Sequence, residues 1–146
     1  MSALHVICRI DDAEYAIRAD DVYQMESFTE ATPVPGAPPH VVGLVQIRQQ
    51  VIPVLDLRAR FGLPAVEPTL ASRVVVLELE DRLVGVLVDS AREVRTIAHE
   101  QFASPPEIVA RQSGGFVRSV ARLEDRIIML LDATKIVEGE AVHAQQ

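Results

Sequence analysis

The chain has 146 residues and a formal net charge of −7, with 49% apolar and 24% charged residues. These values are typical of a soluble globular protein, and they argue against a nucleic-acid-binding surface, which needs dense cationic patches. No apolar run approaches the roughly 20 residues needed to span a bilayer, so we expect no membrane insertion. Met1–Val6 has neither the basic segment nor the long apolar stretch of a signal peptide. Because the single cysteine, Cys8, cannot form an internal disulfide, the sequence favours a cytoplasmic location.

Short apolar or alternating runs recur along the whole chain and predict a β-rich protein. The predicted strands are Leu4–Ile10, Glu14–Arg18, Val41–Ile47, Val51–Leu55, Arg73–Leu79, Leu83–Val88, Arg92–Ile97, Phe116–Leu123 and Ile127–Leu131. Asp20–Met25 fits either a short strand or a turn of helix. Prolines and glycines predict loops at Thr29–His40, Leu63–Ala71 and Ser104–Gly115.

Helices are expected to be few and short. Asp56–Phe61 has a capping aspartate at its start and Gly62 after its end, and Asp132–Val137 is a second short helix at the C-terminus. Many short strands without a long amphipathic helix predict an all-β fold, either small barrels or a sandwich. We expect one domain over residues 1–138 and a flexible tail over residues 139–146.

The segment from Val41 to Arg58 contains the most informative pattern in the chain. Its two apolar runs are joined by a polar turn that presents Arg48 and Gln49. Proline cannot donate a hydrogen bond to a sheet, so Pro53 predicts an edge strand or a bulged strand there. An edge strand beside an exposed turn is a surface suited to docking. Arg48 fits either a solvated side chain or an interface residue, since arginine is favoured at interface centres.

Three aspartates each follow an apolar run: Asp56, Asp89 and Asp132. If they met at one rim they would suit a Mg²⁺ site or acid–base catalysis. An aspartate at such a position is more often a cap, and no second carboxylate stands beside any of them, so capping is the favoured interpretation. The four histidines lack the spacing of metal ligands, and we expect no metal and no cofactor.

Several dispersed motifs resemble those of one family of bacterial signalling proteins, the CheW-like family of chemotaxis coupling proteins. The resemblance runs from about Leu4 to Val137. Its motifs, in chain order, are Glu14-Tyr15-Ala16-Ile17, Val34-Pro35-Gly36-Ala37-Pro38, Val42–Arg48 followed by Val51–Arg58, Val84–Asp89 followed by Val94, and Ala121–Asp132.

This resemblance implies two small five-stranded β-barrels packed side by side, with short helices after Leu55 and at the C-terminus. It also implies a non-enzymatic adaptor that joins the tips of methyl-accepting chemoreceptors to a histidine kinase. The C-terminal domain of such a kinase has the same CheW-like fold, so contacts between CheW-like domains can build rings.

The family's partner-binding surface maps by this resemblance onto Val22, Gln24, Gly43, Arg48, Gln49 and Val84. Gln24 stands where the family has a glutamate, which removes a carboxylate able to pair with Arg48. Gln49 stands where the family has a glycine, a residue tolerant of positive φ, so either the turn differs or the receptor-facing surface is altered. We interpret these departures as those of a divergent or specialised member.

Other functions compete with the adaptor hypothesis. The protein can be a CheW-like scaffold that keeps only ring contacts, or an enzyme that uses Asp56, Asp89 and Asp132. It can also be a barrel that binds an oligonucleotide or a small ligand. The net charge and the few aromatic residues weigh against single-strand binding, which needs stacking platforms in a basic groove.

Overall fold

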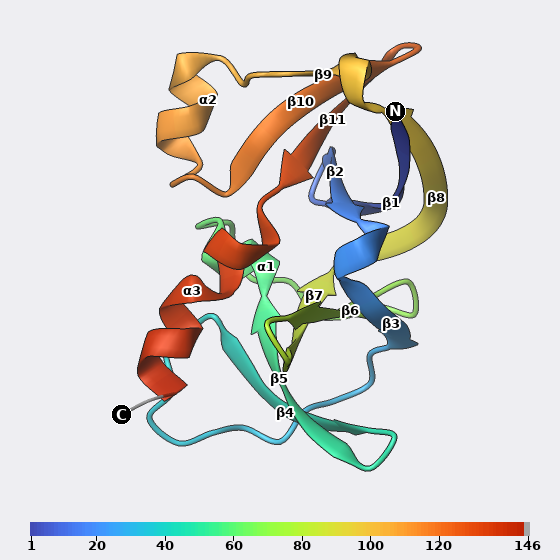
Figure 1. Cartoon of the computed structure of the whole chain (residues 1–146). Coiled ribbons are helices and arrows are strands. Elements are labelled where there is room, and N and C mark those ends of the chain that lie inside the picture. The colour runs from blue at the N-terminus through green and yellow to red at the C-terminus, as the bar shows by residue number, and fades with distance from the viewer. Residues whose placement is uncertain (145–146) are drawn as a thin grey trace.

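The computed structural model describes the backbone of residues 1–144 and the side chains of residues 1–138. In this part of the chain, strands form two separate sheets, which lie one above the other in Figure 1. The strands are β1 (Ser2–Ile10), β2 (Ala13–Arg18), β3 (Val22–Ser27), β4 (Val41–Ile47), β5 (Gln50–Asp56), β6 (Arg73–Leu79), β7 (Arg82–Val88), β8 (Ser90–Ala98), β9 (Phe102–Ala103), β10 (Val117–Leu123) and β11 (Arg126–Leu131). The α-helices are α1 (Leu57–Arg60), α2 (Glu107–Gln112) and α3 (Ala133–Ala144), and two short 3-10 helices, η1 (Ala19–Asp21) and η2 (His99–Gln101), connect strands.

The two sheets share one strand arrangement. The first has the order β8-β1-β2-β11-β10-β9 and is built from both ends of the chain, whereas the second, β3-β6-β7-β5-β4, is built from its middle. In each sheet two antiparallel hairpins meet along a parallel pair, β2 with β11 and β5 with β7. A further strand, β8 or β3, extends each sheet at one side. The predicted all-β fold of two units is confirmed, and the first unit carries an additional two-residue strand, β9.

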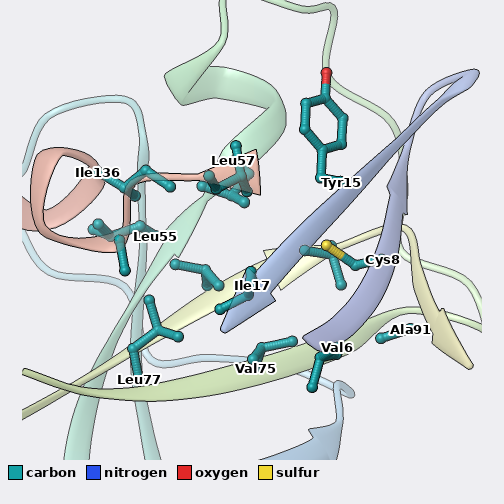
Figure 2. Packing of buried hydrophobic residues seen from close by; sticks show 14 of the residues in the cluster. Val6, Cys8, Tyr15, Ile17, Leu55, Leu57, Val75, Leu77, Ala91 and Ile136 are labelled. Atoms are coloured by element: carbon teal, nitrogen blue, oxygen red, sulfur yellow. The ribbon is translucent and has the colours of Figure 1, made fainter. Parts of the chain in front are cut away.

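A hydrophobic cluster joins the two sheets, and we call it the shared core. It contains Val6 and Ile17 from the first sheet, Leu55 and Leu77 from the second, and Ile136 from α3 (Figure 2). Each sheet also has a smaller cluster of its own. Burial of apolar surface is the dominant favourable contribution to folding, so the shared core holds the two units side by side as expected.

Strand β6 contributes side chains to two hydrophobic clusters, one on each of its faces. Val74 and Val76 belong to the cluster inside the second sheet, and Val75 and Leu77 belong to the shared core. Successive side chains of a strand point to opposite faces, so a strand that is apolar throughout is buried on both sides. The nearly continuous apolar sequence of this strand fits this burial on both faces.

The prediction of an edge or bulged strand around Pro53 is wrong. Pro53 lies in β5, which has β7 on one side and β4 on the other, and the edge strand of this hairpin is β4. Pro53 is tolerated because it pairs only with Leu44 of β4, and the pairing with β7 begins one residue later, at Val54. The bulge in this pair lies in β4, between Val41 and Gly43.

Helices account for the other differences from the sequence-based expectations. The predicted loop Ser104–Gly115 contains α2, and Asp20–Met25 divides into the end of η1 and most of β3. Helix α3 runs beyond the predicted Asp132–Val137 to Ala144. Flexibility of residues 139–146 stays a prediction, and residues 145–146 lie outside the described part of the chain. Within the described residues, no helix has the length and apolar character to cross a membrane.

An ion-pair network ties together strands of the first sheet. Arg126 of β11 donates to both carboxylate oxygens of Glu14 on β2, at 2.9 and 2.8 Å, and to Glu93 on β8 at 2.8 Å. These hydrogen bonds favour the charged form of each carboxylate and hold the pKa of Glu14 and of Glu93 below its usual value. The network therefore makes part of the stability dependent on pH.

We expect Arg126→Met to lower the free energy of unfolding at pH 7 and to lose that effect in acid. Because the folded-state pKa of both glutamates is depressed, their stabilisation is fully present above the unfolded pKa of about 4.3. It disappears as the pH falls through the lower folded-state pKa. Urea unfolding of both proteins between pH 7 and pH 3 measures this convergence.

The matched control is Arg111→Met, which removes an exposed ion pair with Glu107 on α2. Exposed pairs of this kind contribute little, so the control should follow the wild-type curve at every pH. A constant difference between Arg126→Met and the wild type across the range would show that the network acts through packing instead.

Candidate partner-binding surface

The hairpin β4–β5 ends in a two-residue turn. Ile47 pairs with Gln50, which leaves Arg48 and Gln49 as the turn, with φ of +52° and +68°. Two left-handed residues in succession match the right-handed twist of the flanking strands, and this turn usually takes Asn and Gly. Gln49 thus adopts the positive φ without being glycine. The backbone of the turn therefore accommodates Gln49 where the family has glycine. The difference lies at the surface, where Gln49 adds an exposed amide side chain.

Five residues at the end of this hairpin form an exposed face, which we call the hairpin-tip surface: Gln46, Arg48, Gln49, Gln50 and Val51. Val51 is 66% exposed. No ion pair or hydrogen bond to the Arg48 side chain occurs within residues 1–138. Arginine is among the residues enriched at the energetic centres of interfaces.

Strand β3 lies at the opposite edge of the second sheet from β4. Gln24 on this strand is half-buried, its Nε2 donates to Glu26 Oε2, and its Oε1 is buried without a partner in the described part of the chain. The structure therefore does not bring Gln24 and Arg48 together as a pair. Between the end of β3 and β4 lies a pocket of about 270 Å³, lined mainly by residues 26–32 and 44–47.

The other predicted site residues lie further inside. Val22 is half-buried and packs against the shared core, and Val84 is only 5% exposed within it. Val84 is therefore a buried residue, and its assignment to the partner-binding surface stays a prediction. Gly43 is also buried, with Ala31 and Thr32 lying directly against it. Of the six residues assigned by resemblance, only Arg48 and Gln49 are fully exposed.

Gly43 has a structural role that its neighbours explain. Thr32 and Leu44 exchange backbone hydrogen bonds of 2.9 and 2.8 Å, which fastens the proline-containing loop to β4. A Cβ atom on Gly43 would lie 2.3 Å from the carbonyl oxygen of Thr32. With φ at +148°, the position also has a conformation that other residues rarely adopt. Gly43 therefore shapes this region without contacting a partner through a side chain.

Two residues that the sequence analysis overlooked are Tyr23 and Met25 of β3. They are 41% and 38% exposed, whereas Val22 and Gln24 are half-buried. Edge strands with exposed aromatic or Met side chains offer both backbone groups and adaptable apolar contacts to a partner. Tyr23 lies at a bulge in the pairing with β6, between Val22 and Gln24, so regular alternation does not assign its face.

The three strand-ending aspartates have structural partners. Asp56 caps α1 by accepting from the Arg58 backbone at 2.9 Å, and Asp132 accepts from the Lys135 backbone at 3.2 Å. Asp89 pairs with the buried side chain of Arg58 at 2.8 Å and accepts from a backbone N–H of the β1–β2 turn. The capping interpretation holds for two of them, and the third links the two units. The described residues contain no group of three potential ligands able to hold a metal ion.

The described residues form an all-β protein of two packed units, with Arg48 and Gln49 exposed at the end of the β4–β5 hairpin. Comparison with known proteins agrees. The sequence profile of the family described as CheW-like domain matches residues 5–141. The chain belongs to this family.

Relatives and a solved structure resemble the chain over nearly its whole length. "Chemotaxis protein CheW" of Rhizobium meliloti (strain 1021) is 32% identical over 132 residues, which cover 90% of this chain and 85% of that protein. The protein of the same name in Bacillus subtilis (strain 168) is 31% identical over 136 residues, covering 93% and 87%. The crystal structure of the scaffolding protein TtCheW from Thermoanaerobacter tengcongensis has a TM-score of 0.83 and 26% identity, and the match covers 90% of both chains.

Proposed function

We propose that this chain is a non-enzymatic chemotaxis adaptor that couples chemoreceptors to a histidine kinase in a cytoplasmic signalling array. The observation that carries the proposal is the match to the CheW-like family over residues 5–141, together with relatives named as chemotaxis proteins. The roles of the strand-ending aspartates support an adaptor over an enzyme, since Asp56 and Asp132 serve as caps.

The proposed partners are the C-terminal CheW-like domain of the kinase, the tip of a methyl-accepting receptor, and other CheW-like domains in rings. The hairpin-tip surface is the proposed kinase- or receptor-facing contact, because Arg48 is exposed there and has no ion pair or hydrogen bond with any side chain of residues 1–138. A guanidinium that already has a salt bridge must lose it on binding, whereas Arg48 is free to pair with an acidic group on another protein. Tyr23 and Met25 on the edge strand β3 supply a second exposed surface.

Charge reversal by Arg48→Glu should weaken binding to at least one of these partners by about thirtyfold, since an interface arginine contributes roughly 2 kcal/mol or more. The free energy of unfolding should change by no more than about 0.5 kcal/mol, because the site is exposed. Arg and Glu are both non-glycine residues, so the positive φ of this position should cost them similarly. Titration against the kinase's C-terminal domain and against a receptor-tip fragment measures the two affinities separately.

Arg122→Glu is the matched control, because Arg122 is an exposed arginine on β10 of the first sheet. It makes the same change of net charge without touching the hairpin-tip surface, so both affinities should remain at wild-type values. If Arg48→Glu leaves both affinities unchanged, Arg48 does not belong to the interface. If neither partner binds the wild type, while other CheW-like domains do, the protein keeps only ring contacts.

A further inference from the structure

The first sheet carries an open cavity that the proposed adaptor role does not use. Its volume is about 580 Å³, within the range of small-molecule sites, and Ile97, Phe102 and Leu130 form an apolar part of its wall. Two arginines, Arg18 and Arg118, also line it. None of the described residues that line it is acidic, although the chain as a whole carries a net charge of −7.

One buried polar side chain in the wall is neutral. His5 is 3% exposed, and its Nδ1 lies 3.0 Å from the carbonyl oxygen of Ala3. Because a carbonyl only accepts, Nδ1 carries the hydrogen and donates it. The His5 ring also packs against Phe102, with 5.3 Å between centroids. Burial lowers the pKa of His5 from its ordinary value, so the imidazole adds no positive charge to the cavity at neutral pH.

The two arginines differ in their availability. The guanidinium of Arg18 lies 3.6 Å from the carboxylate of Asp20, so it already has an acidic neighbour. Arg118 is exposed on β10 and has no ion pair or hydrogen bond with any side chain of residues 1–138. A guanidinium presents a planar fork that matches a carboxylate with two parallel hydrogen bonds. Arg118 is therefore the group best placed to bind an anion at this cavity.

We propose that the cavity binds a small amphiphilic carboxylate. The carboxylate group pairs with Arg118, and the apolar body packs against Ile97, Phe102 and Leu130. A compact polyanion such as phosphate would gain little from the apolar wall, and it usually needs several cationic groups. An uncharged apolar molecule would leave Arg118 unused. The combination of one free guanidinium with an apolar wall selects a ligand that has both features.

Octanoate is a suitable probe, and backbone amide resonances of the full chain can follow its binding by NMR. We expect saturable shifts at Phe102 and Ser119, which line the cavity. Arg118→Gln should weaken octanoate binding about tenfold or more, since a hydrogen bond to a charged group contributes about 1.5–3 kcal/mol, the equivalent of that change. Uncharged octanamide should bind the wild type more weakly by a similar factor.

The matched control is Arg122→Gln, which removes the same charge from the same strand at a position outside the cavity. It should bind octanoate as the wild type does. The proposal is overturned if octanoate produces no saturable shifts, or if the shifts fall on residues away from the cavity. Equal weakening by Arg118→Gln and Arg122→Gln would also overturn it, since it would show attraction by net charge alone. Both positions are exposed, so both variants should fold normally.

Discussion

Leu55→Ala should lower the free energy of unfolding by about 2–5 kcal/mol and should weaken both units of the protein together. Leu55 has no exposed surface, and its side chain lies in the shared core with Ile17 of the first sheet and Ile136 of α3 (Figure 2). Truncating a buried leucine costs the lost transfer free energy and leaves a cavity that the surroundings fill only in part. A loss of this size is a large fraction of the stability of an ordinary domain.

Urea unfolding gives the loss in free energy, and amide hydrogen exchange shows where it falls. Because the shared core contains residues of both sheets, amides of β2 and of β7 should lose protection in parallel. Leu70→Ala is the control, since Leu70 is 98% exposed and its truncation should change stability by no more than about 0.5 kcal/mol. Loss of protection in the second sheet alone would show that the units unfold independently.

Gly43→Ala should also cost about 2–5 kcal/mol, for a different reason. The new methyl group would lie 2.3 Å from the Thr32 carbonyl oxygen, and a backbone atom cannot move aside without breaking the Thr32–Leu44 hydrogen bonds. Strain at a positive φ and crowding of a packed site each cost about 1–3 kcal/mol. Faster hydrogen exchange at the amides of Thr32 and Leu44 should accompany the loss of stability.

Gly36→Ala separates the two contributions, because Gly36 has φ of +77° but no heavy atom within 4 Å of the added carbon. It should show the conformational strain alone, about 1 kcal/mol, and leave the exchange of Thr32 and Leu44 unchanged. Equal losses for the two variants would mean that the contact with Thr32 is unimportant. In that case Gly43 would again be a candidate partner-binding residue, as the resemblance implies.

The sequence predicted the exposure of candidate site residues only where that exposure follows from the local sequence pattern. A polar turn between two apolar runs placed Arg48 and Gln49 at the surface, and the structure has them there. The same local pattern did not identify Tyr23 or Met25, because a bulge between Val22 and Gln24 interrupts the alternation along β3. Val84 and Gly43 were placed at the surface by resemblance, and their burial depends on neighbours distant in the sequence.

The sequence by itself determined most of the strands, the hairpin turns and the capping roles of Asp56 and Asp132, since each depends on residues a few positions apart, but it left β3 open and did not predict β9. Tertiary structure alone decided the order of the strands. The parallel pair β2–β11 joins residues more than a hundred positions apart, as does the hydrogen bond from Arg126 to Glu14. Pairing of β5 with β7 likewise placed Pro53 inside a sheet, where its own pattern indicated an edge. Periodicity shows which side chains share a face of a strand, but which element covers that face depends on contacts between distant segments.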